Sequence, residues 1–322
     1  MNGAVLGIDT SNYTTSAALV SLTGEVLADR RELLPVPNGG VGLRQSDALF
    51  LHLSQWPALF AKVPVKGQDV RAVAVSASPR THALSYMPVF LAGYNFGYTV
   101  AHGLGVPLLT FSHQEGHIRA ALCALPRQPA SEFIAVQVSG GTTDVLYVCP
   151  RALGGYDLRV LAASQDLHAG QFIDRVGVHM GMSFPCGQSL DALARAHTDA
   201  PYAIPSAVKG GKISFAGPAT AAIRALDRGV PKGAVAVGVF RCIANSLEKV
   251  LRSCTAETNV NSVVLCGGVA ANSHIRLRLV GRLARLNFLL APPNMAGDNA
   301  VGTALLGLDT IKSKEASSGD CY

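Results

Sequence analysis

The chain has 322 residues, of which 49% are hydrophobic and 15% are charged. This balance excludes a disordered or fibrous protein, because enough apolar surface is available to offset the entropy of ordering the chain. The length predicts two compact lobes or one large domain. Lysine and arginine (27) exceed aspartate and glutamate (21), and this surplus is compatible with a polyanionic partner without demonstrating one.

The sequence predicts neither an export signal nor a membrane-spanning segment. Polar residues from Asp9 to Tyr13 interrupt the apolar start of the chain, and no run of about 18 apolar residues follows. The seven cysteines are scattered and contain no CxxC pair, which disfavours a disulfide framework or a structural zinc site. We therefore expect a cytoplasmic protein that does not associate with membranes.

Short apolar stretches bounded by turns predict strands early in the chain, and apolar residues at helical spacing predict two helices there. The strands are expected at 5–8, 16–20, 25–33 and 72–75, with a small-residue turn at 76–79. The helices are expected at 42–63, where Pro57 kinks or divides the helix, and at 88–104.

The segments 6–20 and 133–148 share one plan. Each has an apolar strand, a small polar turn with paired threonines, and a second apolar strand. This similarity predicts two related lobes that face each other, although strand–turn–strand units also occur in unrelated proteins. We expect an N-terminal lobe at 1–121 and a C-terminal lobe at 122–297, followed by a last helix and tail at 298–322 that return to the N-terminal lobe.

Helical patterns dominate the second half of the chain. The expected helices are 169–180, 188–196, 217–226, 232–254, 270–286 and 298 to about 311, and a buried strand is expected at 262–265. The polar tail 312–322 is expected to be frayed.

His113 and His117 carry the sharpest local signal. They are four residues apart, so on a helix they lie on one face and can share a metal ion. A zincin metallopeptidase requires a glutamate directly after the first histidine. Here Glu115 follows His113 by two positions, so the spacing does not match. Asp298, in a loop before the last predicted helix, is a candidate third ligand. Two alternatives stay open: the histidines line a lobe interface, and Asp298 is an ordinary helix N-cap.

Two glycine turns follow buried strands. Gly140 and Gly141 lie between two strands, where backbone N–H groups can approach an anion closely. Gly267 and Gly268 precede a predicted helix, whose N-terminus suits a phosphate or a nucleoside. Ordinary turns are the alternative for both. Neither turn matches a Walker loop or a GxGxxG fingerprint, which disfavours P-loop ATPases and Rossmann dehydrogenases.

Charged residues on two predicted helices allow two interpretations each. Asp174 holds ribose hydroxyls or pairs locally with Arg175, and spacing alone favours the local pair. Four arginines lie on the predicted helix 270–286 and either contact RNA phosphates or form a solvated face, which is the commoner outcome. They are Arg276, Arg278, Arg282 and Arg285, and the last three are expected to share a face.

Taken together, these motifs resemble the TsaD family, the tRNA N6-adenosine threonylcarbamoyltransferases once described as O-sialoglycoprotein endopeptidases. The resemblance covers nearly the whole chain, from Leu6 to Ala300. Its most specific carriers are His113-Gln114-Glu115-Gly116-His117, Val138-Ser139-Gly140-Gly141, Ala169-Gly170 with Asp174, Ser214-Phe215 and Gly267-Gly268-Val269-Ala270-Ala271-Asn272.

The resemblance implies an α/β protein with the two-lobed actin/sugar-kinase/Hsp70-like (ASKHA) fold, in which duplicated mixed β-sheets are flanked by helices. It implies one divalent metal ion (iron, zinc or magnesium) on His113, His117 and Asp298, and an adenine nucleotide (threonylcarbamoyl-AMP, ATP or ADP). The matching substrate-binding or nucleotide-binding positions are Val138, Ser139, Gly140, Gly141, Thr142, Asp174, Gly187, Gly267, Gly268 and Asn272. No catalytic residue is assigned, and Asp9 and Ser11 are the candidates.

The implied activity is metal-dependent transfer of a threonylcarbamoyl group from threonylcarbamoyl-AMP to N6 of adenosine 37 of tRNA. The implied partners are tRNA and either TsaB-like or TsaE-like helper proteins or an active TsaD relative. A metal ion that contacts carbonyl and phosphate oxygens would polarise the acyl carbon, and backbone amides of the turn 139–142 would hold developing negative charge.

The chain departs from the family pattern around the expected acyl-transfer centre. The first loop follows Ser11 and begins with Asn12. In this loop Tyr13 and Thr14 stand in place of two acids of the family. In the turn after the strand 133–138, Thr142 replaces a histidine. A lysine is lost from the segment 214–220, and the family's Y-P-G-G-P is F-P-C-G-Q at 184–188. These departures indicate a divergent paralogue. Two alternatives to the family reaction follow, namely carbamoyl or acyl transfer to another acceptor and a non-catalytic nucleotide-binding partner subunit.

Overall fold

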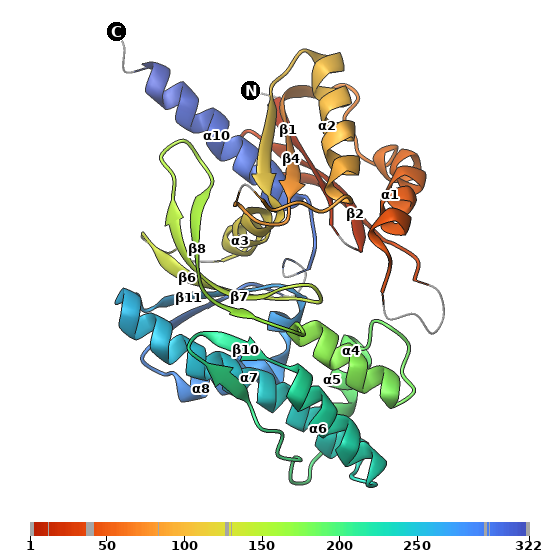
Figure 1. Ribbon diagram of the computed structural model, residues 1–322. Coiled ribbons are helices and arrows are strands. Elements are labelled where there is room, and N and C mark those ends of the chain that lie inside the picture. The colour runs from red at the N-terminus through yellow and green to blue at the C-terminus, as the bar shows by residue number, and fades with distance from the viewer. Residues whose placement is uncertain are drawn as a thin grey trace.

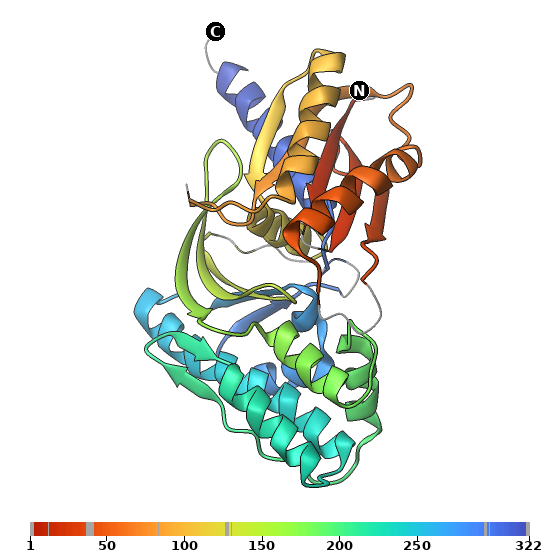
Figure 2. The same ribbon diagram turned by 45° about the vertical axis from the view of Figure 1, so that its right-hand side comes forward.

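The computed structural model describes residues 3–11, 13–36, 42–82, 84–125, 129, 131–292, 295 and 297–319, so Asn12 and the last three residues lie outside it. These residues form two β-sheets, one above the other, with helices between and outside them (Figure 1). The turned view shows the same separation into an upper and a lower lobe (Figure 2). Among the described residues, no helix is both long enough and apolar enough to cross a membrane.

The sheet of the upper lobe is built around strand β1. Every residue of β1 is buried, because helices cover both faces of the sheet at this strand. In spatial order the strands are β3 (Val26–Leu33), β2 (Thr14–Ser21), β1 (Gly3–Thr10), β4 (Asp69–Ser78) and β5 (Leu108–Ser112).

The sheet of the lower lobe is larger and is built around strand β6. In spatial order its strands are β12 (Asn287–Leu290), β11 (Ser262–Cys266), β6 (Phe133–Val138), β7 (Thr143–Pro150), β8 (Tyr156–Ser164), β10 (Lys212–Ser214) and β9 (Ala207–Lys209). Five of them repeat the upper sheet, since β8-β7-β6-β11-β12 has the order and directions of β3-β2-β1-β4-β5. The predicted α/β fold with duplicated mixed sheets is confirmed.

Helices cover both outer faces and fill the space between the sheets. On the outer face of the upper sheet lie α1 (Gln45–Phe60) and α2 (Phe90–Leu104). Against the outer face of the lower sheet lie α4 (Ala169–His179), α5 (Gly187–Ala196), α6 (Ala216–Asp227), α7 (Lys232–Thr258), the 3₁₀ helix η1 (Gly268–Ala271) and α8 (Ser273–Arg282). Between the sheets lie α3 (His113–Cys123) and α10 (Val301–Gly319).

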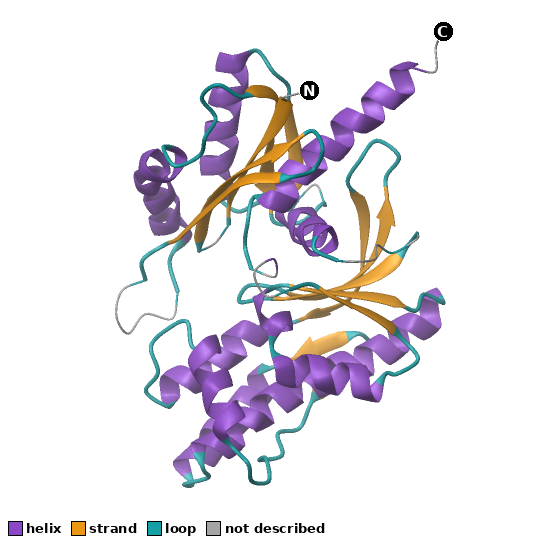
Figure 3. Cartoon of the chain, turned by 180° about the vertical axis from the view of Figure 1, so that it is seen from behind, coloured by secondary structure: helices purple, strands orange, loops and turns teal. Residues whose placement is uncertain are grey.

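The layer between the sheets joins the two lobes through one apolar core. Val5 and Ala74 of the upper sheet, Ile118 of α3, Leu305 of α10 and Leu146 of the lower sheet belong to the same buried cluster. Seen from behind, α10 begins between the sheets and runs outward along the upper lobe to the C-terminal end (Figure 3). It packs against α3, β1 and β4.

Several predicted elements differ from those observed. Pro57 lies inside α1 near its end and does not divide it. The predicted helix 270–286 is wrong, because the chain forms η1, turns, and then forms α8, which ends at Arg282. The last helix begins at Val301 rather than 298, and it continues to Gly319, so most of the tail expected to fray is helical.

Gly302 fixes how closely α10 approaches α3. A Cβ atom at this position would lie 1.9 Å from the carbonyl oxygen of Gly116, which no side chain tolerates. We expect Gly302→Ala to lower the free energy of unfolding by about 1–3 kcal/mol, because the two helix backbones must separate. Urea denaturation measures this change.

Gly281→Ala in α8 is the matched control. Nothing lies within 4 Å of an added Cβ there. Alanine is the better helix former, so this variant should be as stable as the parent or more stable by about 0.5–1 kcal/mol. Equal unfolding free energies for the two variants would contradict the proposed packing constraint.

Candidate active site

The structure brings together the three candidate metal ligands, although Asp298 lies far from the histidines in sequence. Nε2 of His117 is 3.1 Å from Oδ1 of Asp298, and Nε2 of His113 is 3.6 Å from the same oxygen. One ligand atom from each of the three residues lies within 4.8 Å of the others. Asp298 precedes the first turn of α10, so it is not the N-cap of that helix.

The start of α3 is fixed by its own sequence. Ser112 and Glu115 form a capping box, in which each side chain accepts a hydrogen bond from the backbone N–H of the other residue. The second oxygen of Glu115 accepts hydrogen bonds from Arg151 and from the backbone N–H of Tyr156, both in the lower lobe. Glu115 therefore begins the helix and links the lobes, and its carboxylate is not available to activate a metal-bound water.

Asp9 and Ser11, the two candidates for a catalytic role, contact the candidate metal ligands. Oδ1 of Asp9 is 2.8 Å from Nδ1 of His113, which leaves Nε2 of that imidazole facing the cluster. The hydroxyl of Ser11 donates to Oδ2 of Asp298 at 2.8 Å, and that of Thr14 lies at 3.4 Å. Contacts of this kind orient metal ligands and set the tautomers of ligating histidines.

The donor set fits a divalent cation. Imidazole nitrogens suit zinc and iron, whereas magnesium prefers oxygen ligands, so two histidines favour the first two. Asp9 is fully buried, and its Oδ2 has no hydrogen-bond partner among the described residues. The carboxylates of Asp9 and Asp298 thus lie beside the imidazoles of His113 and His117. A bound cation would balance the two carboxylate charges.

The carboxylates also control the protonation of the cluster. Burial acts to lower the pKa of His113, but the carboxylates of Asp9 and Asp298 outweigh it and raise this pKa to about 10. Burial likewise acts to raise the pKa of Asp298, but hydrogen bonds from His113 and His117 hold it well below its ordinary value.

Two neighbouring cavities meet at the turn between β6 and β7. The first has a volume of about 380 Å³, and His113 and Asp298 line it together with the turn 139–142. The second has a volume of about 320 Å³ and extends from the same turn to Asp174 and Phe184. Tyr13, Gly140 and Gly141 line both cavities, so a ligand that spans them would pass over the glycine turn.

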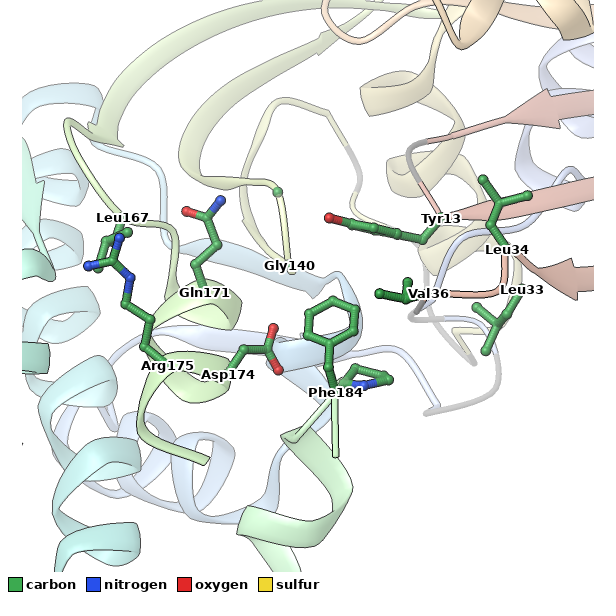
Figure 4. Close-up of a pocket in the computed structure, with 12 residues that line it drawn as sticks. Tyr13, Leu33, Leu34, Val36, Gly140, Leu167, Gln171, Asp174, Arg175 and Phe184 are labelled. Carbon is green, nitrogen blue, oxygen red and sulfur yellow. The ribbon is translucent and has the colours of Figure 1, made fainter. Parts of the chain in front are cut away.

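Figure 4 shows the second cavity from the side. The rings of Tyr13 and Phe184 lie beside each other at the cavity with their centroids 5.8 Å apart and their planes tilted by 59°. The carboxylate of Asp174 points into the cavity, and its Oδ1 accepts a hydrogen bond from the backbone N–H of Cys186 at 2.8 Å. Burial raises the pKa of Asp174.

The other predicted nucleotide-binding residues do not line these two cavities. Val138 is buried in the core, and Gly267 packs against it so closely that a Cβ atom would lie 2.4 Å from the Val138 carbonyl oxygen. Asn272 caps α8 by accepting from the backbone N–H of Ile275, and its amide donates to Asp191. Gly187 and Gly268 are also absent from both linings. Nucleotide binding by these residues stays a prediction.

Three of the four arginines predicted on the helix 270–286 donate hydrogen bonds to protein partners. Arg276 donates to two backbone carbonyls, Arg278 donates to Asn245, and Arg282 donates to Glu248. Arg285 lies beyond the end of α8, so the predicted face of 278, 282 and 285 is wrong. Because these guanidinium groups stabilise the lower lobe, we do not assign this helix to RNA.

Sequence reasoning missed several residues that line the first cavity, among them Arg80 and Gln137. Arg80 directly follows the turn predicted after the strand 72–75, and a charged residue at the end of a buried strand is a usable signal. Gln137 lies inside an apolar strand, where the only signal was a polar residue in an otherwise hydrophobic run.

Two facing lobes with duplicated sheets define an ASKHA-type protein, and solved structures agree. The activator of the 2-hydroxyisocaproyl-CoA dehydratase from Clostridium difficile, solved with ADPNP, has a TM-score of 0.57 at 15% identity and covers 98% of this chain and 97% of its own. HypF from T. kodakarensis has a TM-score of 0.58 at 17% identity, covering 97% of this chain and 48% of its own. These similarities show the fold.

Sequence comparison defines the family. A family model described as tRNA N6-adenosine threonylcarbamoyltransferase, TsaD, matches residues 56–305. A protein of that name from Thermus thermophilus is 31% identical, over 94% of this chain and 91% of its own. Another from Thermosipho africanus is 27% identical, over 96% of this chain and 94% of its own. The chain belongs to the TsaD family, and the predicted resemblance is confirmed.

We expect the stability of the metal-free protein to depend on His113 at alkaline pH. The pKa of this imidazole rises from 6.5 to about 10 on folding, so its charged form adds stability that is fully present below pH 6.5 and is lost as the pH rises through about 10. In the presence of a chelator, the difference in unfolding free energy between the parent and His113→Gln should shrink across this range.

Urea denaturation at several pH values between about 6 and about 10.5 measures that difference. The subtraction cancels the titration of lysines, tyrosines and cysteines, which is common to both proteins. A difference that stays constant over the whole range would contradict the assigned charge of His113.

Proposed function

We propose that this chain transfers a threonylcarbamoyl group from its adenylate to N6 of adenosine 37 of tRNA, using one divalent metal ion held by His113, His117 and Asp298. One observation carries the proposal: in a member of the TsaD family, two residues of this cluster, His113 and Asp298, line a cavity together with the glycine turn 139–142. That cavity adjoins a second one, which we assign to the adenosine part of the donor.

A bound metal ion would polarise the acyl carbonyl and offset the charge of the departing phosphate. The chain's own residues prepare this step. Asp9 keeps Nε2 of His113 directed at the ligand position, and Ser11 holds the carboxylate of Asp298 by its outer oxygen. We assign the backbone N–H groups of Gly140 and Gly141 to the developing negative charge, because both glycines line the cavity and glycine lets a ligand approach the backbone closely.

The second cavity suits a nucleoside. Its lining is largely apolar, and Tyr13 and Phe184 offer aromatic rings from opposite lobes. We assign the inward carboxylate of Asp174 to the ribose hydroxyls, which donate hydrogen bonds to carboxylates. This assignment favours the functional interpretation of Asp174 over a local pair with Arg175, since the ion pairs found among the described residues do not include one between them.

A second candidate function is acyl or carbamoyl transfer to another acceptor. It is favoured by Tyr13 and Thr14, which stand where the family has two acids, beside the cavity that holds the cluster. Asp298 is the only carboxylate among the described residues that line this cavity. Deprotonation of the acceptor then falls to His82, because the other histidine of the lining, His113, is assigned to the metal ion.

Incubation with threonylcarbamoyl-AMP and unmodified tRNA tests the proposal, with helper proteins of the family added. Mass spectrometry of the digested tRNA should reveal the threonylcarbamoyl nucleoside, and His117→Ala should reduce it to background. Adenylate turnover without any tRNA product would favour the second candidate. Nucleotide binding without turnover of the adenylate would favour a non-catalytic partner subunit.

We expect Asp9→Asn to weaken metal binding about 10–100-fold, because the neutral amide no longer fixes the tautomer of His113 or adds charge to the site. Metal content after dialysis against buffers of graded free zinc or iron measures the affinity. Asp174→Asn, in the second cavity, is the control and should retain the parent's affinity. Equal metal affinities for Asp9→Asn and the parent would contradict the positioning role.

A further inference from the structure

The cavity beside the metal-ligand cluster contains two polar side chains that neither the metal site nor the nucleotide site uses. Gln137, on β6, is only 2% exposed, and its Oε1 has no hydrogen-bond partner among the described residues. A buried carbonyl oxygen without a donor costs free energy, so this atom is suited to an N–H or O–H group of a ligand.

Arg80 lines the same cavity from the upper lobe. Its Nη2 donates a hydrogen bond to Oδ1 of Asp144 at 3.2 Å and lies 2.9 Å from Oδ2 of the same carboxylate in an ion pair, and the Asp144 side chain is fully buried. Within the described part of the chain, Nε and Nη1 of Arg80 have no hydrogen-bond partner. The guanidinium is therefore held at one nitrogen, has a side chain 36% exposed, and retains donors for an anion.

The backbone on either side of Arg80 is also fixed. The hydroxyl of Ser78 donates to the carbonyl oxygen of Arg80, and the N–H of Arg80 donates to the hydroxyl of Ser85. The N–H of Gln114, at the start of α3, donates to the carbonyl oxygen of Pro79. Arg80 thus stands on an anchored segment, which favours a defined binding position over a solvated surface charge.

Strand pairing places Gln137 next to this guanidinium. Gln137 on β6 and Asp144 on β7 are direct partners in the antiparallel ladder, so their side chains lie side by side on one face of the sheet. Asp144 also accepts from the Gln114 amide at 3.0 Å, and Gln114 is adjacent to His113 in α3. The carboxylate of Asp144 therefore contacts Arg80 and the Gln114 side chain at the start of α3, and it lies beside Gln137 on the sheet.

A ligand that satisfies both groups needs an N–H donor close to an anion. Guanidinium binds carboxylates most effectively, through parallel hydrogen bonds. A carbamoyl group carried on the nitrogen of an amino acid, such as threonylcarbamoyl, has this arrangement, because its N–H lies beside the amino-acid carboxylate. An unsubstituted carbamoyl group has the N–H but no carboxylate.

We propose that Arg80 and Gln137 form the subsite for the acyl part of the donor, in which Arg80 pairs with the amino-acid carboxylate and Oε1 of Gln137 accepts the carbamoyl N–H. The identity of the donor rests on the function proposed above. The subsite selects a carboxylate-bearing carbamoyl group over carbamoyl itself.

Two unreactive donor analogues test the proposal, namely the sulfamoyl-adenosine analogues of threonylcarbamoyl-AMP and of carbamoyl-AMP. Titration calorimetry gives the ratio of their dissociation constants for the metal-loaded full chain. The parent should prefer the threonylcarbamoyl analogue by about 10–100-fold, the range of a charge-assisted hydrogen-bonded pair. Arg80→Gln should abolish this preference, and Arg80→Lys should restore part of it.

Gln137→Leu should behave differently. It removes the acceptor of an N–H that both analogues carry, so both should bind about 3–10-fold more weakly while their ratio stays that of the parent. A ratio is insensitive to the fraction of folded protein, so a general loss of stability does not imitate the effect of Arg80→Gln.

Arg151→Gln is the matched control. Arg151 also joins the lobes through a buried carboxylate, that of Glu115, but it does not line the cavity. This variant should keep the parent's ratio. An equal change of ratio for Arg151→Gln and Arg80→Gln would overturn the subsite, and so would an unchanged ratio for Arg80→Gln or no binding of either analogue.

The outcome is separable from that of the proposed function. A parent that forms the tRNA product but shows no preference between the analogues overturns the subsite and leaves the function intact. A parent that shows the preference, lost in Arg80→Gln, but modifies no tRNA supports the subsite and overturns transfer to tRNA.

Discussion

The contact between the backbones of α3 and α10 is the constraint on which the candidate site depends. His113 and His117 lie on the first turns of α3, whereas Asp298 enters the site from the segment that leads into α10. Gly302 lets the two helices touch at Gly116, between the two histidines. The carboxylate of Asp298, near the end of the sequence, thereby reaches both imidazoles. Bringing charged groups together away from water is unfavourable, and the apolar packing between the sheets offsets this cost.

Two ion pairs join the lobes, and in each of them a buried carboxylate of one lobe contacts an arginine of the other. Asp144 of the lower lobe binds Arg80, and Glu115 of the upper lobe binds Arg151. Each carboxylate has a second partner, the amide of Gln114 or the backbone N–H of Tyr156, so neither is left unpaired where water is excluded. These paired contacts set the separation of the lobes beside the cavity, whereas isolated surface ion pairs add little.

The sequence predicted what depends on local pattern. The hairpins of β1–β2 and β6–β7 and the helical spacing of His113 and His117 follow from short-range pattern, whereas the duplicated mixed sheets were implied by the resemblance to the family. It did not predict partners that depend on tertiary contact. Nothing local shows that Asn272 caps α8, that Arg276 binds two carbonyls, or that Asp9 lies against His113. Asp298 was a ligand or a cap on sequence grounds, and only the packing of α10 beside α3 brings it to the histidines.

The net charge of the candidate site depends on the residues of the first loop. With a divalent ion, the carboxylates of Asp9 and Asp298 and two neutral imidazoles would give a net charge near zero, and the ion pair of Arg80 and Asp144 adds none. Two further acids in the first loop would make the cavity negative. Tyr13 and Thr14 stand there instead, and the Thr14 hydroxyl lies 3.4 Å from Asp298. An anionic ligand in this cavity therefore meets less repulsion than two further carboxylates would cause, because Tyr13 and Thr14 are neutral and Arg80 retains donors that attract an anion.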